Sequence, residues 1–272
     1  MKDLNLGGAQ TIDEVVEQMD QIIAWSIAKQ SRLGYFAALY RKVTVQVRQG
    51  IHTNLFEDGP RMERLDVLFA NRYLHALDAY LKGNPASQVW KLAFDQARSP
   101  KPLILQHLLL GMNAHINLDL GIAAAETCPG DAIHSLRGDF MKINDVLSSL
   151  VDEVRSEINT LSPWIGFLDN LSPKASDAIA NFSMKKARDA AWTFAQHLAP
   201  LSKDSFARAV HFKDEEMTLL GEGVAHPPGL LLRAGLWAIR LRESKQIERN
   251  IEVLNQSAPV SVPVAQSMAP NT

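Results

Sequence analysis

The segment from Gln106 to Asp119, QHLLLGMNAHINLD, constrains the fold most, because it places six polar side chains in an otherwise apolar run. A helix with ~100° per residue puts these side chains on two opposite sides. One side carries His107, His115 and Asp119, and the other carries Gln106, Asn113 and Asn117. A buried polar group without a partner costs about 1–3 kcal/mol. We therefore expect a helix surrounded by protein, with polar partners supplied by other elements.

The other hydrophobic residues also recur at helical spacing, and no stretch alternates apolar and polar residues over a useful strand length. Helix starts are indicated by the capping box Thr11-Ile-Asp-Glu14 and by Pro60, which stands where a first-turn proline belongs. We predict an all-α fold, a single multi-helix bundle of about eight or nine helices with the polar-studded helix buried at its centre.

One domain is expected to hold most of the chain. We predict that residues 11–256 form this single all-helical domain and that residues 1–10 are a flexible N-terminus. Residues 257–272 are rich in Pro, Ser, Ala, Gln and Val without periodicity, which predicts a disordered tail. Near the C-terminus, we expect one helix to end at Gly221-Glu-Gly223 and another to run from Pro228 to Val253 without a break.

Composition excludes several classes of protein. The formal net charge of −2 is spread over mixed signs, which indicates neither a nucleic-acid partner nor a cationic one. The single cysteine, Cys128, excludes an intramolecular disulfide and fits a reducing compartment. We find no apolar signal core at the N-terminus and no run of the ~18–20 apolar residues that spans a bilayer. We expect a cytoplasmic protein without a membrane span. The sequence does not decide the oligomeric state.

Charged residues also interrupt the apolar face of the helix expected from residue 60 to 82. Asp66 and Arg72 lie on that face or at its edge. One interpretation is an amphipathic helix whose long arginine side chains reach solvent. The other is a group of paired charges that includes His115 and Asp119, because buried charges persist only when paired, hydrogen-bonded or bound to metal. We predict the pairing, with Asp66 and Arg72 as the partners.

His115 and Asp119 stand four residues apart, so an imidazole and a carboxylate are adjacent on one helix face. They can share a divalent metal (zinc, iron or manganese) or hydrogen-bond directly. A metal needs three or four ligands, and the candidates for the rest are His52, His75, His134, Asp58, Asp66, Asp139 and Asp145. No Glu-x-x-His, His-Glu-x-x-His or Cys-x-x-Cys motif selects among them. A satisfied polar cluster in a helix-packed core is the alternative.

Further polar residues are candidates for ligand binding. The full set is Asp58, Arg61, Arg72, Asn113, Asn117, Arg188 and Trp192. Asp58, with His52, precedes the charged helix and can close over a cavity beside it. Arg188 and Trp192 share a helix face at i,i+4 spacing, where they either stack in the core or form the wall of a ligand site.

Two blocks carry a family resemblance: residues 56–74, FEDGPRMERLDVLFANRYL, and residues 107–120, HLLLGMNAHINLDL. They resemble domain-of-unknown-function family 5995, an uncharacterised, mostly bacterial, helical family. The resemblance covers about residues 50 to 200, including Phe140-x-x-Ile-Asn144 and Arg188-x-x-Ala-Trp192. It implies an all-helical domain and no established activity. The motif residues that it implies are Asp58, Arg61, Asp66, Arg72, His107, Asn113, His115 and Asp119.

A shorter resemblance concerns chemistry. The order Gly111-x-x-Ala-His115-x-x-x-Asp119 is similar to the helix of zinc-dependent phospholipases C and related single-strand nucleases, in which the histidine and aspartate bind metal. This similarity covers fewer than about a dozen residues. The Gln-Pro-x-His continuation of those enzymes is replaced here by Leu-Gly-Ile-Ala at residues 120–123.

Two classes of function remain open. The first is a small-molecule enzyme with hydrolysis-type chemistry, in which His115 and Asp119 hold a metal or polarise a water and Asp66 or His107 acts as the base. A metal-bound water with a pKa near ~7 would then attack an ester or phosphoester. The second is a non-catalytic ligand-binding or scaffold protein whose buried polar network specifies the register of the helices.

Overall fold

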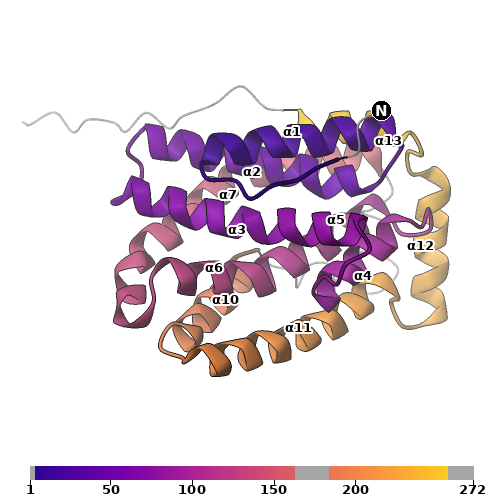
Figure 1. The fold of residues 1–272 in the computed structure, drawn as a ribbon. Helices are drawn as coiled ribbons and strands as arrows, with labels where there is room; N and C mark the ends of the chain where they lie inside the picture. The colour runs from indigo at the N-terminus through magenta and orange to yellow at the C-terminus, as the bar shows by residue number, and fades with distance from the viewer. Residues whose placement is uncertain (1–3, 163–183, 257–272) are drawn as a thin grey trace, which may run out of the picture.

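The structure is a computed structural model that describes residues 4–162 and 184–256, and every regular element in these two ranges is helical (Figure 1). They contain eleven α-helices: α1 (Ile12–Ala28), α2 (Leu33–His52), α3 (Gly59–Leu81), α4 (Gln88–Ala97), α5 (Ile104–Ala114), α6 (Leu120–Thr127), α7 (Ile133–Leu161), α10 (Met184–Leu198), α11 (Lys203–Ala225), α12 (Leu230–Arg242) and α13 (Ile247–Asn255). The predicted all-α class is confirmed. The predicted number of about eight or nine helices was too low.

The central helix is one source of the difference. α5, the residues His115–Asp119 and α6 follow one another without a loop, but the middle five residues form a π-helical turn. The N–H of Leu120 donates to the carbonyl oxygen of His115, five residues earlier. One continuous helix, which the apolar pattern predicts, is therefore divided by a local change of winding.

The C-terminal region is the other source. The helix predicted from Pro228 to Val253 is wrong, because α12 ends at Arg242 and α13 begins at Ile247. Glu243 leaves the helix in an extended conformation, and its carboxylate accepts a hydrogen bond of 3.0 Å from the N–H of Ile104. The N–H of Ser244 donates to the carbonyl oxygen of Leu161 at 3.0 Å. These bonds to residues of distant helices take the place of the backbone hydrogen bonds that a continuous helix would make at this point.

The predicted helix end at Gly221 is also wrong, since α11 continues to Ala225. A Cβ atom on Gly221 would lie 2.8 Å from Cδ2 of Leu92 on α4 and 3.2 Å from Nδ2 of Asn113 on α5. This glycine therefore allows α11 to approach two other helices closely and does not terminate it.

The helix starts that local sequence can specify are present. Thr11 caps α1 by accepting a hydrogen bond of 3.2 Å from the N–H of Glu14. Asp58, which precedes the expected charged helix, caps α3 by accepting one of 2.9 Å from the N–H of Arg61, with a proline in the first turn. Both caps satisfy N–H groups that a helix start leaves without partners.

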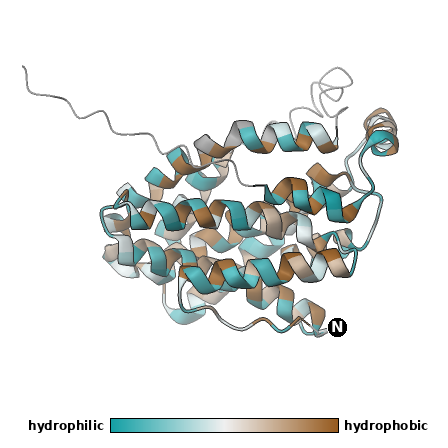
Figure 2. Cartoon of the chain, turned by 90° about the horizontal axis from the view of Figure 1, so that it is seen from above, coloured by the Kyte–Doolittle hydropathy of each residue, from teal (hydrophilic) through white to brown (hydrophobic). Residues whose placement is uncertain are grey.

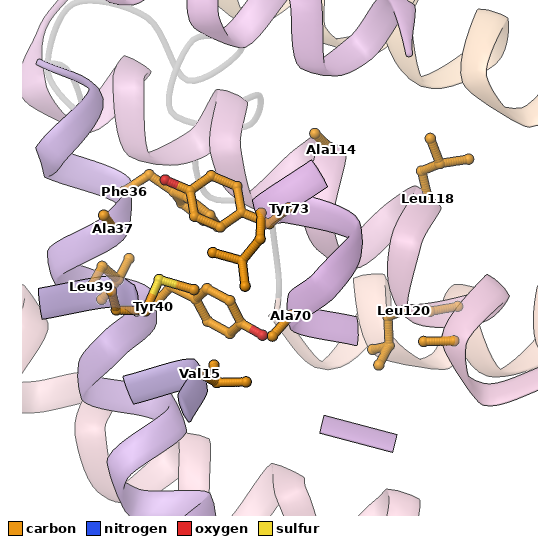
Figure 3. Close-up of a cluster of buried hydrophobic side chains, with 14 of the residues drawn as sticks. Val15, Phe36, Ala37, Leu39, Tyr40, Ala70, Tyr73, Ala114, Leu118 and Leu120 are labelled. Carbon is orange, nitrogen blue, oxygen red and sulfur yellow. The ribbon is translucent and has the colours of Figure 1, made fainter. Parts of the chain in front are cut away.

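The α5–α6 helix runs through the middle of the bundle. α1, α2 and α3 lie along one side of it and α10 and α11 along the other, while α12 crosses the end of the bundle (Figure 1). Figure 2 shows hydrophilic and hydrophobic residues on different sides of the outer helices, as amphipathic helices require. The core includes rings of Phe36, Tyr40 and Tyr73 from α2 and α3, which lie together in Figure 3.

The segment Ile104–Thr127 is long and apolar enough to cross a membrane by length and composition, which the sequence reading missed. Within its most apolar window, 89% of the residues are buried inside the protein. A core helix of this length passes the same test, so the feature is weak evidence for a span.

The first described residues lie against α3. Leu6 and Ala9 are buried. The side chain of Asn71 accepts a hydrogen bond from the N–H of Ala9 at 2.7 Å and donates to its carbonyl oxygen at 2.9 Å. Residues 6 and 9 thus have specific contacts, while the flexibility of residues 1–10 stays a prediction. The tail predicted for residues 257–272 lies outside the described residues.

Gly111 provides a first test of this packing. A Cβ atom here would lie 2.4 Å and 2.5 Å from two ring atoms of Phe36, a buried residue that cannot move away freely. We expect Gly111→Ala to lower the free energy of unfolding by about 1–3 kcal/mol, because overpacking outweighs the helix preference of alanine. Gly223, in the exposed part of α11, has nothing within 4 Å of such an atom. Gly223→Ala should stabilise by about 0.5–1 kcal/mol. Urea unfolding followed by circular dichroism compares them; equal effects would contradict the close contact.

Candidate functional site

The π-helical turn places His115 and Asp119 side by side in the core. His115 is 3% exposed and Asp119 is 1% exposed. Nδ1 of His115 and Oδ2 of Asp119 are 3.6 Å apart, which is too long for a hydrogen bond. A π-helical turn inside an α-helix is rare and is found frequently at functional sites. This turn is therefore the first structural indication of a site.

Aromatic rings from three helices surround His115. The ring of Phe69 on α3 stacks on the imidazole, with centroids 3.5 Å apart and planes inclined by 8°. Tyr40 on α2 meets it edge-on at 4.3 Å, and Phe36 does so at 5.6 Å. Trp90 on α4 lies 6.0 Å away. The imidazole thus occupies an apolar, π-rich environment that favours its neutral form.

Asp119 is held by two donors from other helices. Nε of Arg72 on α3 donates to Oδ1 at 2.7 Å, and Nε1 of Trp90 donates to Oδ2 at 2.7 Å. The predicted pairing of Asp119 with Arg72 is therefore present, whereas no hydrogen bond or ion pair within the described residues joins the other predicted partner, Asp66, to His115 or Asp119. The arginine side chain is 29% exposed, so it links the buried carboxylate to the protein surface.

Three polar side chains near one another have atoms without hydrogen-bond partners among the described residues: both ring nitrogens of His115, the hydroxyl of Tyr40 and Oδ2 of Asp66. The ring of Tyr40 meets His115 edge-on, and the charge of Asp66 acts on Tyr40. Native proteins leave few buried polar atoms unpaired, and each such atom calls for an explanation. We name His115, Asp119, Arg72, Trp90, Tyr40, Asp66 and Phe69 the His115 cluster.

Burial sets the charge states of the His115 cluster. It lowers the pKa of His115, and the neighbouring Asp119 only partly opposes this, so the imidazole is neutral at pH 7. Burial alone would raise the pKa of Asp119, but Arg72 and the hydrogen bonds bring it below its usual value. Burial, with a contribution from Glu63, raises the pKa of Asp66 to about 7. Burial and Asp66 raise the pKa of Tyr40.

His107 lies apart from this cluster. Its ring meets Tyr35 edge-on at 5.7 Å, and burial together with Arg32 and Arg240 lowers its pKa to about 3. Neither ring nitrogen has a hydrogen-bond partner within residues 4–162 and 184–256. It lines a small cavity of about 20 Å³ with Phe36 and Trp90, large enough for one water molecule. The same two rings contact His115 at 5.6 Å and 6.0 Å, so they lie between the cavity and the imidazole of His115.

The two proposed metal ligands, His115 and Asp119, gain no third donor. No group of three or more His, Cys, Asp or Glu side chains in the described ranges is arranged to hold a metal ion. Both carboxylate oxygens of Asp119 already accept hydrogen bonds, one of them from a guanidinium. A divalent cation beside Arg72 would also meet like-charge repulsion. The described residues around His115 and Asp119 therefore do not fit a metal ion.

Asp58 and Arg61 belong to a different contact. Arg61 pairs with Asp139 on α7 at 2.9 Å. Asp139 is fully buried and also accepts hydrogen bonds from the N–H groups of Glu57 and Asp58, at 2.7 Å and 3.0 Å. These bonds tie the α2–α3 connection to α7. His52 is an exposed residue at the end of α2.

The remaining candidates hold helices together. Nδ2 of Asn117 donates to Oδ1 of Asn113 at 2.9 Å, and Nδ2 of Asn113 donates to the carbonyl oxygen of Met217 on α11 at 2.8 Å. Arg188 on α10 donates to the carbonyl oxygen of Phe140 at 2.6 Å and to Asn144 at 2.7 Å, both on α7. Trp192 packs on the ring of Phe140, with centroids 5.0 Å apart.

Sequence reasoning missed Tyr40, Phe69 and Trp90 as members of the His115 cluster. Phe69 and Tyr40 carry helical core spacing like many other aromatic residues, so nothing local distinguished them. A signal did exist for Trp90, because a buried indole N–H needs an acceptor and a buried aspartate needs donors. Which acceptor it meets depends on how α4 packs on the central helix.

A model of the family of unknown function DUF5995 matches residues 12–227, which is most of the chain. A search of curated proteins and a search of solved structures found no match. The matched range includes every residue of the His115 cluster and ends before α12.

Proposed function

Since this chain belongs to the family of unknown function DUF5995, we propose a function from its own site: the His115 cluster binds a small, neutral molecule with one polar group. The observation that carries this proposal is the convergence of polar atoms without partners in the described structure, from α2, α3 and the π-helical turn. A ligand that hydrogen-bonds to them would remove their desolvation penalty.

The surroundings indicate the chemistry of the ligand. Apolar rings on several sides favour a compact, flat, apolar body. A neutral His115 offers one donor and one acceptor, and the hydroxyl of Tyr40 offers a donor. Arg72 is already paired with Asp119, so an anionic ligand has no counter-charge in reach. A small phenol-like or amide-like molecule satisfies all three conditions.

Access requires movement of side chains on α3. Phe69 stacks on His115 and is only partly buried, and Arg72 is partly exposed one turn further along. Rotation of these two side chains would open a route from solvent to the imidazole without moving a helix. A ligand would therefore enter between α3 and the π-helical turn.

Replacing His115 and Tyr40 by apolar residues tests the proposal without knowledge of the ligand. We expect His115→Leu and Tyr40→Phe each to leave the free energy of unfolding unchanged or to raise it by about 1 kcal/mol, since neither removes a protein hydrogen bond. Trp90→Phe, which removes a real bond to Asp119, should lower it by about 1–2 kcal/mol. Losses above about 1 kcal/mol for both site variants would favour a structural scaffold instead.

Phenol is a suitable binding probe, because it combines a flat ring with one group that donates and accepts. We expect phenol to raise the melting temperature of the wild type and to have a much smaller effect on His115→Leu. An equal rise in both proteins would place the phenol outside the His115 cluster and contradict the proposal.

A hydrolytic enzyme is the second candidate, supported by the His115–Asp119 geometry. A modest approach from 3.6 Å would let Asp119 orient the imidazole, which its lowered pKa keeps in the basic form. The imidazole could then take a proton from a water that attacks a neutral ester. Hydrolysis of 4-nitrophenyl acetate by the wild type, lost in His115→Leu, would support this activity; equal rates in both proteins would exclude His115 as the base.

A further inference from the structure

α12 presents an apolar stripe to solvent. Leu230, Trp237 and Leu241 are 85%, 65% and 51% exposed, and their spacing of seven and four residues puts them on one side of the helix. Ala234 lies between them and is also exposed. Large apolar side chains gathered in a row on a protein surface indicate an interaction site.

The fold does not need this stripe. The opposite side of α12 supplies the packing, where Ile239 is fully buried against Leu103 and Leu232 and Leu236 lie beside them. Arg240 adds a hydrogen bond of 2.7 Å to the carbonyl oxygen of Pro100. The helix is thus anchored from behind, and its outer side is available.

Arginines flank the stripe. α12 contains Arg233, Arg240 and Arg242 and no acidic residue, although the whole chain has a formal net charge of −2. Helical spacing puts Arg233 and Arg240 on one edge of the stripe and Arg242 on the other. Arg240 is paired with Glu243 at 3.2 Å, so exposed positive charge beside the stripe comes from Arg233.

The location of α12 suits a flat partner. The helix crosses the end of the bundle and stands at its margin (Figure 1), so its outer side can lie on a surface without interference from the helices behind it. It also follows the range matched by the family model, which ends at residue 227. α12 therefore lies outside the part of the chain that the family model matches, and the His115 cluster lies inside that part.

We propose that α12 binds peripherally to an anionic lipid bilayer, with Leu230, Trp237 and Leu241 in the interfacial region and Arg233 at the phosphate groups. Leucine and tryptophan on one side with flanking basic residues are the features of helices that lie in a membrane interface. A second copy of the chain fits less well, because α12 contains no acidic residue that could pair with Arg233 of the other copy.

Vesicle flotation tests this proposal with the full chain. We expect binding to vesicles of phosphatidylcholine with phosphatidylserine, weakening with added salt, and little binding to phosphatidylcholine alone. Trp237→Ser with Leu241→Ser should weaken binding at least about tenfold, since it removes most of the inserted apolar area. Arg233→Glu should weaken binding to the anionic vesicles by about tenfold or more, since each basic residue contributes roughly fivefold.

The control is Phe212→Ser with Leu219→Ser on α11, which removes an aromatic and a leucine that are 69% and 75% exposed. This variant should bind anionic vesicles as the wild type does. All the changed residues are exposed, and circular dichroism verifies that the variants fold. Absence of wild-type flotation, or flotation unchanged by the α12 variants, would overturn the proposal. The proposal would also be overturned if the wild type formed a dimer and the Trp237→Ser and Leu241→Ser variant were a monomer. Binding to polyglutamate without binding to vesicles would overturn it as well.

Discussion

Arg72→Met is expected to lower the free energy of unfolding by about 2–4 kcal/mol at pH 7.5, because it leaves the carboxylate of Asp119 buried without its cation. Asp119 is 1% exposed, and methionine retains the packing of the arginine stem. The expected loss lies below that of a fully buried pair, since the Arg72 side chain is 29% exposed. Trp90 still donates one hydrogen bond to the carboxylate.

The effect of Arg72→Met should depend on pH with a definite sign. In the wild type, the pKa of Asp119 is below its usual value, so the pair stabilises the fold above the unfolded pKa of about 4 and is lost as pH falls through the folded pKa. Without Arg72, burial raises the pKa of Asp119, and the carboxyl takes up a proton on mild acidification. The difference between variant and wild type should therefore shrink as pH falls from 7.5 toward 5.

Urea unfolding of both proteins at several pH values measures this difference. Arg64→Met serves as the control. Arg64 is exposed on the same helix, and the only hydrogen bond of its side chain within the described residues goes to the carbonyl oxygen of Thr127, at 3.3 Å. It should change stability by less than about 0.5 kcal/mol. A loss for Arg72→Met that is the same at every pH would contradict a buried, ionised Asp119.

Asp139→Ala should lower the free energy of unfolding by about 3–5 kcal/mol, as breaking a buried charge network does. It leaves the N–H groups of Glu57 and Asp58 without their acceptor and Arg61 without its carboxylate. Asp139→Asn keeps the volume but turns an amide NH₂ toward a backbone N–H, and about 2–3 kcal/mol should be lost. Amide hydrogen exchange at residues 57 and 58 should accelerate in both variants.

The contribution of Asp139 should disappear in acid. Burial alone would raise its pKa, but the two backbone N–H groups and Arg61 hold it below its usual value. Its stabilisation is thus present above the unfolded pKa of about 3.9 and is lost as pH falls through the folded pKa. Asp145→Ala, at an exposed position of the same helix, is the control and should change stability by less than about 0.5 kcal/mol. Equal losses for Asp139→Ala and Asp145→Ala would contradict the anchoring role.

Much of the fold could be predicted from the sequence, because helical periodicity and capping are local properties. The apolar spacing alone indicates an all-α chain, and Thr11 and Pro60 mark helix starts that the structure contains. The two polar sides of the central helix were also predictable. Asn113 and Gln106 indeed bond to α11, whereas His115 and Asp119 face α2, α3 and α4.

The sequence by itself also determined that Asp119 must have a partner, because a buried carboxylate is tolerated only when it is paired, and Arg72 was a candidate on an apolar face. Only the tertiary structure decided that Trp90 would be the second donor and that Phe69 would cover His115. It likewise decided that Asp139 would hold the α2–α3 connection. Partners far apart in the chain are selected by helix packing, and many arrangements satisfy the same local pattern. The π-helical turn belongs to this second group, since its extra residue per turn leaves the apolar pattern of Ile104–Thr127 unchanged.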